Sequence, residues 1–149
     1  MFPNAKGSEL FAVLATIDPA SLAVGTVTTA WIPVTNFHAL VADVHSGVLG
    51  ASATLDAKLQ QALDGSGTSA KDITGKAITQ LTQAGGGSSR QALINVKPEE
   101  LDTVNGFGYV RLSMTVGVAA SLASAQLLGV NPRYATADAF NQSAVAQIV

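Results

Sequence analysis

The sequence contains no cysteine and few charged or aromatic residues. Charged side chains make up 12% of the 149 residues and aromatic side chains 5%, and the charged share is about half that of an average soluble protein. Without cysteine the chain has no disulfide framework, no thiolate metal site and no cysteine nucleophile. At this length we expect one domain that is large enough to bury a sizeable core.

The positive charges are scattered along the chain. Eight Lys and Arg residues stand against ten Asp and Glu residues, for a net charge of −2, and the positive ones are spread from Lys6 to Arg133. A nucleic-acid binder needs a basic patch or stripe, and a protein that binds anionic membranes needs basic residues on an amphipathic helix. We therefore expect neither a nucleic acid nor a membrane as partner.

One uncharged run, LSMTVGVAASLASAQLLGV (112–130), is almost long enough for a membrane-spanning helix, which needs about 20 apolar residues. Its first part does not have a helical pattern, because large apolar side chains occur at every second position: Val110, Leu112, Met114, Val116 and Val118. Strict period two is typical of a strand with one buried face. The run therefore predicts two strands with a turn near residues 119–121, and the second strand covers about residues 122–130.

The same period recurs elsewhere, with glycine-rich turns between the segments. HALVADVHSGV (38–48) has an apolar set that we expect to face inward: Leu40, Ala42, Val44 and Val48. QALINV (91–96) alternates in the same way, and TVTTAWIPV (26–34) is rich in β-branched residues, with Pro33 marking an edge or an end. We expect its Trp31 in the core. KPEELD (97–102) predicts one helical turn that begins at its proline.

Together these features predict an all-β fold in a single domain. Residues 1–12 are expected to form an N-terminal arm. Residues 135–149 have weak periodicity and are expected to form a C-terminal tail that docks on this domain or on a neighbour.

The segment SATLDAKLQQALD (52–64) fits two structures equally well. Thr54, Asp56 and Lys58 alternate with apolar residues, as in a strand, whereas Leu55 and Leu59 have the i, i+4 spacing of an amphipathic helix. The periodicity alone leaves both open.

No group of residues points to catalysis. Asp43 and His45 would share one face of a strand, but a metal site needs three or four ligands and no third candidate stands at a telling spacing. AKDITGKA (70–77) departs from the phosphate-binding loop, because Ala70 replaces its first glycine and Ala77 its metal-binding hydroxyl. We therefore assign no catalytic, metal-binding or cofactor-binding residue, and expect no enzyme and no cofactor.

Four stretches together resemble the small structural proteins that tailed bacteriophages encode in their head-gene clusters, near the major capsid gene. They are VLATIDP (13–19), GTVTTAWIPVTNF (25–37), TLDAKLQQALDGSGTSAKDITGKAITQLT (54–82), and GYVRLSMTV (108–116) with LLGVNPRY (127–134). The resemblance covers roughly residues 13–134. It implies a β-sandwich, often a jelly roll, that acts as a capsid decoration (cement) protein. It also implies that TLDAKLQQA is a strand.

The resemblance further implies partners and a location. The partners would be the major capsid protein and other copies of the chain, as a dimer or trimer, and the protein would lie on the capsid surface of the virion after assembly in the host cytoplasm. Two alternatives stay open, which are a head–tail connector or tail component and a carbohydrate- or ligand-binding β-sandwich module.

The candidate partner-binding residues lie in the arm, in the tail and in two turns. Arg and Tyr are enriched at protein interfaces, and apolar side chains on extended termini can reach a neighbouring subunit. The candidates are Phe2, Phe11, Phe37, Arg133, Tyr134 and Ile148.

Overall fold

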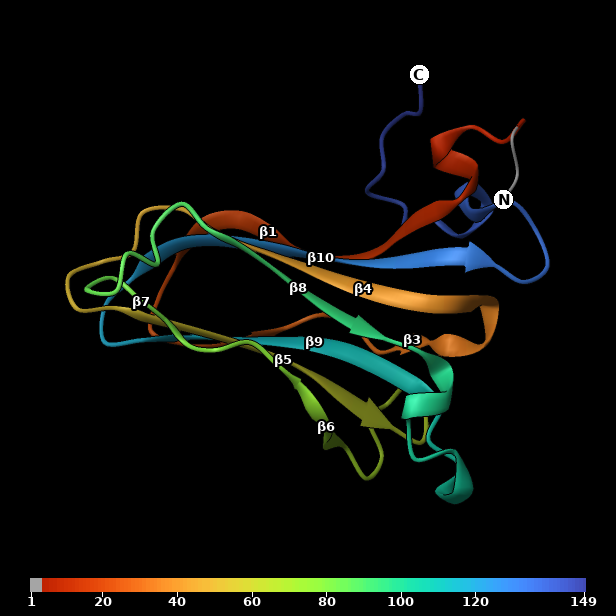
Figure 1. Cartoon of the computed structure of the whole chain (residues 1–149), viewed down its shortest axis with the longest axis horizontal. Coiled ribbons are helices and arrows are strands. Elements are labelled where there is room, and N and C mark those ends of the chain that lie inside the picture. The colour runs from red at the N-terminus through yellow and green to blue at the C-terminus, as the bar shows by residue number, and fades with distance from the viewer. Residues whose placement is uncertain (1–3) are drawn as a thin grey trace.

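The chain folds as a β-sandwich of two antiparallel sheets (Figure 1). The computed structural model describes residues 4–149, so the candidate Phe2 lies outside the described residues. Sheet A contains, in spatial order, β1 (Phe11–Leu22), β10 (Ser121–Pro132), β4 (Phe37–Ser46) and β8 (Gln91–Val96). Sheet B contains β2 (Gly25–Thr28), β9 (Tyr109–Gly117), β5 (Thr54–Ala62) and β6 (Lys71–Ala77), with the short strands β3 (Ile32–Pro33) on β9 and β7 (Leu81–Thr82) on β5.

The strand order is that of a jelly roll. The pairs are nested, since β1 pairs with β10, β2 with β9, β4 with β8, and β5 with β6. The chain thus behaves as one long antiparallel ribbon whose hairpin lies between β5 and β6, and the ribbon is wrapped so that its strands fall into two sheets. Eight main strands in two sheets of four are the jelly-roll architecture. The expected all-β, jelly-roll-like sandwich is confirmed.

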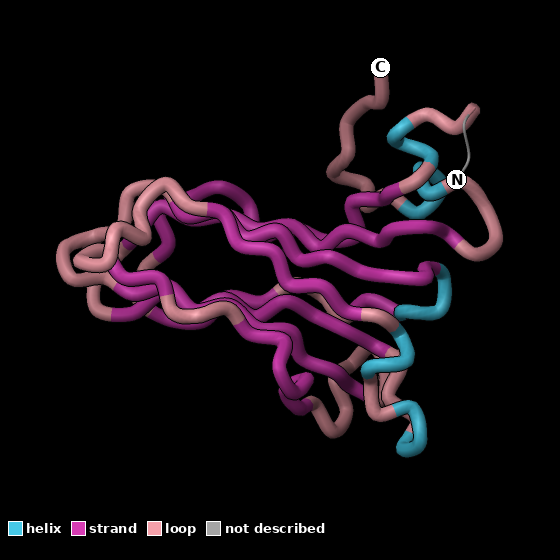
Figure 2. The backbone as a smooth tube through the Cα atoms, in the orientation of Figure 1, coloured by secondary structure: helices cyan, strands magenta, loops and turns pink. Residues whose placement is uncertain are grey.

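The two ends of the sandwich differ. Five 3₁₀ turns lie at the end that carries the termini (Figure 2): η1 (Gly7–Glu9), η2 (Val34–Asn36), η3 (Pro98–Glu100), η4 (Thr103–Asn105) and η5 (Ala137–Phe140). Turn η3 is the helical turn predicted from KPEELD. The opposite end, here called the loop end, consists of residues 23–24, 47–53, 83–90 and 118–120. Within residues 4–149 no helix is long and apolar enough to cross a bilayer.

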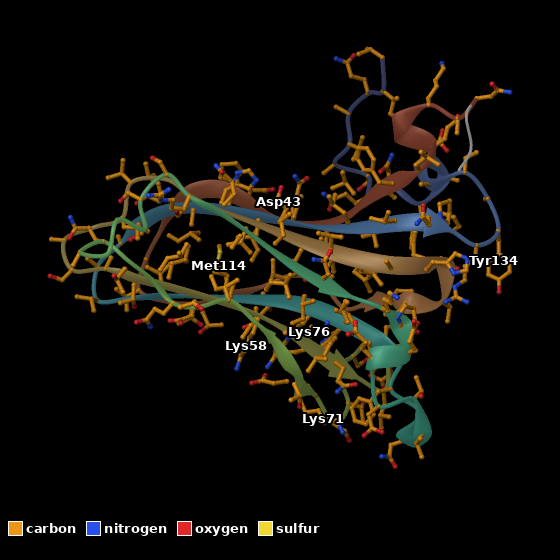
Figure 3. The ribbon with its side chains drawn as sticks, viewed as in Figure 1. Asp43, Lys58, Lys71, Lys76, Met114 and Tyr134 are labelled. Carbon is orange, nitrogen blue, oxygen red and sulfur yellow. The ribbon has the colours of Figure 1, made fainter. Side chains whose placement is uncertain are left out.

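The core lies between the sheets and follows the predicted alternation. In β9 the side chains of Val110, Leu112, Met114 and Val116 are buried, and Figure 3 shows Met114 between the two sheets. Residues 54–62 form strand β5, with Leu55 and Leu59 both fully buried and paired along β9. This segment is a strand and not a helix because β5 lies between β9 and β6 and its backbone forms hydrogen bonds with both.

Three predictions about burial are wrong. Val118 and Val48 are exposed, because each lies one or two residues beyond the end of its strand, in a turn of the loop end. Trp31 is only half-buried, and the Arg111 guanidinium stacks on its ring at 4.5 Å from the centroid. The indole therefore covers a charged side chain instead of filling the core.

Val118 adopts a backbone conformation that is rare for its type. Its φ is 70°, and the amide of Ala119 donates to the carbonyl of Gly117 at 2.9 Å, which makes Val118 the centre of a three-residue γ-turn. A β-branched residue with positive φ is strained, at a cost of about 1–3 kcal/mol. The turn holds an exposed valine at a position that suits glycine or asparagine.

The C-terminal segment docks on its own domain. Ala137 of η5 is fully buried, and the ring of Phe140 meets that of Phe37 edge to face at a centroid distance of 5.4 Å. The Val13 amide donates to Asn141 Oδ1 at 2.8 Å, and the Gln142 amide donates to the Val13 carbonyl at 2.8 Å. These bonds cover part of the edge of β1, since β1 is the outermost strand of sheet A.

Gly129 in β10 tests this packing. A Cβ at this position would lie 2.6 Å from the buried Phe37 ring, so we expect Gly129→Ala to lower the free energy of unfolding by about 1–3 kcal/mol, as overpacked cores do. Gly108→Ala is the control, because its Cβ would meet nothing within 4 Å. Urea denaturation measures both variants. A Gly129→Ala protein as stable as the control would contradict this account of the packing.

Candidate interaction surface

The outward side of sheet A is apolar near the start of β1 and polar toward the loop end, where it carries Asp43, His45 and Gln126. Since Leu40, Ala42 and Val44 point into the core, the intervening residues of β4 point outward. Across the sheet Val41 pairs with Leu128, which in turn pairs with Val13. The outward apolar residues are here called the sheet A face: Phe11, Val13, Val41, Leu93, Leu128 and Val130; the register pairs Leu93 with Asp43, so it neighbours Val41 only diagonally.

Two members of the sheet A face are well exposed. Leu93 is 63% exposed and Phe11 44%, and the other four are half-buried. Leu93 lies in β8, whose core side is already filled by Ile94 and Val96. It therefore gives nothing to the core of this domain, and a large apolar side chain in water is available for contact with another molecule.

The outward side of sheet B has the opposite character. Its side chains are polar and bond to one another: Lys58 to Asp72 at 2.7 Å, Gln60 to Asp72 at 2.8 Å, Arg111 to Gln60 at 2.9 Å, and Thr26 to Thr115 at 2.7 Å. Figure 3 shows Lys58 on this side of the sandwich and Asp43 on the side of sheet A. A face whose polar groups are paired and solvated gains little from a partner.

Carboxylates around sheet B are held in their charged form by these bonds. Hydrogen bonds from Lys58 and then Gln60 lower the pKa of Asp72 below its ordinary value of 3.8. The hydrogen bond from Lys76 does the same for the pKa of Glu100, and that from Lys71 for the pKa of Asp102.

A bulge in β1 forms an open hollow beside the sheet A face. The register of β1 against β10 shifts between Ile17 and Ala20, so Asp18 and Pro19 stand out of the ladder. Two open hollows of about 260 and 340 Å³ lie against this bulge, and both include His45 and Ser124 among their lining residues.

The expected proximity of Asp43 and His45 is confirmed. His45 Nε2 lies 2.9 Å from Asp43 Oδ2, on the outward side of β4. Within residues 4–149 no group of three or more His, Asp or Glu side chains is placed to hold a metal ion. The pair alone supplies two of the three or four ligands that a metal site needs.

The structure places the five described candidate residues in different surroundings. Phe11 belongs to the sheet A face, and Phe37 is buried within the domain at 1% exposure. Tyr134 is 81% exposed at the terminal end, where Figure 3 shows its side chain directed away from the domain. Arg133 is exposed and its Nε donates to the carbonyl of Phe37 at 3.0 Å, and Ile148 is exposed in the tail.

Sequence reasoning missed most of the sheet A face. The signal was present, because QALINV and AQLLGV carry large apolar residues on both phases of the alternation, Leu93 beside Ile94 and Leu128 beside Leu127. Apolar residues on both phases of a strand are typical of a strand that is covered on both sides.

No protein-family model and no curated protein matches the sequence. Among solved structures, the SPBc2 prophage-derived protein YomS aligns with 10% identity over 81% of this chain and 93% of its own, with a TM-score of 0.47. A protein of the cowpea mosaic virus empty virus-like particle aligns with 11% identity over 87% of both chains, with a TM-score of 0.42. TmCBM61, solved with β-1,4-galactotriose, aligns with 8% identity over 80% of this chain and 70% of its own, with a TM-score of 0.34. The jelly-roll assignment itself rests on the strand order of this chain.

The lowered pKa of Asp72 gives a pH dependence of known sign. Its folded-state pKa lies below the unfolded value of 3.8, so the stabilisation is present above that value and is lost as the pH falls through the folded pKa. Lys58→Met should remove part of it, at most about 1 kcal/mol for an exposed pair. Urea denaturation at about pH 7 and pH 3 should show a smaller acid loss in the variant. An equal loss in both proteins would contradict the assignment.

Proposed function

We propose that this chain is a structural protein of a tailed-phage virion, a decoration protein that binds the outside of the head and stabilises it. Its partners would be the major capsid protein and further copies of itself, and its place would be the capsid surface. The proposal includes no enzymatic activity and no cofactor. The proposal is supported by two observations, which are the resemblance of residues 13–134 to phage head proteins and the jelly-roll fold of the domain.

The difference between the two outward faces carries the proposal. The sheet A face is apolar, with Leu93 and Phe11 exposed, whereas the outward side of sheet B is covered by paired polar groups. A domain that lies on a shell needs one side that loses water on contact and another that stays hydrated. Because the contact repeats at many equivalent places on a lattice, each copy needs only modest affinity.

The alternatives make different predictions about copy number and ligand. A decoration protein should occur at on the order of hundreds of copies per particle, and a connector at about a dozen, because connectors occupy a single vertex. Gel densitometry of purified particles against the major capsid band separates the two. A carbohydrate-binding module would instead show a ligand-dependent rise in melting temperature in a glycan screen.

Leu93→Asp tests the binding face directly. Placing a carboxylate in a face that must lose water should weaken binding to heads that lack the protein by at least about tenfold, or about 1.4 kcal/mol. The matched control is Thr28→Asp, which adds the same charge to an exposed position on sheet B. Co-sedimentation with heads measures binding, and urea denaturation shows that both variants fold.

Thermal release of DNA gives the functional readout. Heads with wild-type protein should release DNA at a higher temperature than bare heads, and heads incubated with Leu93→Asp should behave as bare heads. If Leu93→Asp and Thr28→Asp bind equally well, the sheet A face is not the contact. If saturating wild-type protein leaves the release temperature unchanged, the stabilising role is wrong.

A further inference from the structure

The loop end of the sandwich carries a second apolar surface that neither the core nor the sheet A face explains. Four aliphatic side chains are exposed there, between 47% and 67%, and they are here called the loop-end patch: Val24, Val48, Val118 and Leu122. The backbone brings them together. The amide of Leu122 donates to the carbonyl of Val48 at 3.0 Å, Val24 lies two residues after Leu22, which pairs with Ser121, and Val118 opens the turn that leads into β10.

The surroundings of the patch carry few charges. The loops that make this end, residues 23–24, 47–53, 83–90 and 118–120, contain one charged side chain, Arg90, whose Nε donates to the carbonyl of Gly86 at 3.0 Å. Leu122 also borders the open hollow of about 340 Å³, whose lining is mixed: Pro19, Ala20 and Ala123 are apolar, and His45, Ser46 and Ser124 are polar. The patch is thus four exposed aliphatic side chains with a partly polar recess beside them, and it can take a segment that carries an aliphatic anchor and neutral polar side chains.

Backbone strain gives an independent sign of function at this place. The γ-turn holds Val118 at a φ of 70° with its side chain in water, although glycine or asparagine would adopt that turn with less strain. Backbone strain is concentrated at functional positions in many proteins, which is consistent with a role for this exposed isopropyl group.

One segment of this chain has the complementary character. Residues 143–149, SAVAQIV, contain no charged side chain, and Ile148 and Val149 are both exposed. Upstream of them Gln142 is fixed to Val13 at the far end of sheet A from the patch (Figure 1). The segment begins about where β1 begins, and the patch lies where β1 ends.

The reach of this segment decides whether it can cover the patch of its own domain. Val13 pairs with Leu128. The distance along β10 from Leu128 to Leu122 is six residues, or about 20 Å. Six residues from Gln142 to Ile148 span at most about 20–22 Å when fully extended. Ile148 would only just arrive at Leu122, and Val48 and Val118 beyond it would stay uncovered.

The geometry points to an assembly in which residues 143–149 of one copy lie on the loop-end patch of a second copy, with Ile148 in the recess beside Leu122. The inference deepens the self-association part of the proposed function and rests on it, but it uses neither the shell nor the sheet A face. Contact between opposite ends of the molecule joins copies head to tail, as a reciprocal pair or a closed ring.

Two variants test the contact from its two sides. Ile148→Asp places a carboxylate in residues 143–149 and leaves the loop-end patch unchanged. Leu122→Asp places a carboxylate in the loop-end patch and leaves residues 143–149 unchanged. In sedimentation equilibrium between roughly 1 μM and 1 mM, wild-type protein should associate, and each variant should associate at least about tenfold more weakly. The controls place the same charge elsewhere, as Gln147→Asp within the segment and Val104→Asp on the exposed η4 turn at the opposite end.

Mixing the two variants gives the decisive measurement. An equimolar mixture contains one intact segment and one intact patch, so it should form a 1:1 pair at concentrations at which each variant alone associates at least about tenfold more weakly than wild type. A mixture that stays monomeric overturns the inference, and so does a wild-type protein that is monomeric throughout the range. If Leu122→Asp weakens association and Ile148→Asp does not, the patch binds something other than this segment, which overturns it too.

A further variant guards against misfolding. Val118→Asn removes the isopropyl group while suiting the left-handed backbone, so it should unfold at the same or a higher urea concentration than wild type and still associate more weakly. Association at wild-type strength would contradict a role for Val118. Leu93→Asp should self-associate normally, which keeps a failure of shell binding distinct from a failure of this contact.

Discussion

The packing of two inner sheet faces against each other is the interaction on which the rest of the molecule depends. Few ion pairs are available to a chain with 12% charged residues, so burial of apolar surface must supply most of the stability. The inner faces combine small side chains such as Ala42, Ala57 and Ala125 with large ones such as Leu127 and Met114. Side chains of mixed sizes let the two layers interdigitate. This packing fixes which side of each strand faces the core and therefore which residues form the outward faces.

The sequence predicted the strands well wherever one face of a strand is buried. Alternation in residues 110–116 and 40–44 is strong because every second residue is fully buried. The alternation led to wrong predictions at Val48 and Val118. Apolar residues there continue the period of two, but both lie beyond the last residue of the strand. It could not decide between strand and helix at Leu55 and Leu59, where both periods place the leucines on one side.

The candidate surface was harder to predict than the fold. A residue such as Leu93 looks like core in the sequence, and only the register with Asp43 shows that it points outward. Phe37 and Phe11 are the same residue type in similar strand contexts, yet one is buried beneath Phe140 and the other faces water. Distinguishing them requires knowledge of where the C-terminal segment lies, which depends on contacts more than 100 residues apart in the chain.

The nested ribbon also fixes the order in which the protein can be made. Strand β10 lies between β1 and β4, although it is the last of the ten strands to be synthesised. Until residues 121–132 have left the ribosome, β1 has no neighbour in its sheet and β4 can pair only with β8. Pairing across such separations is slow, because the chain must close a long loop before any contact forms. Sheet A and its outward face are therefore complete only after β10 joins β1 to β4, so an unfinished chain lacks the full face with which to bind a partner.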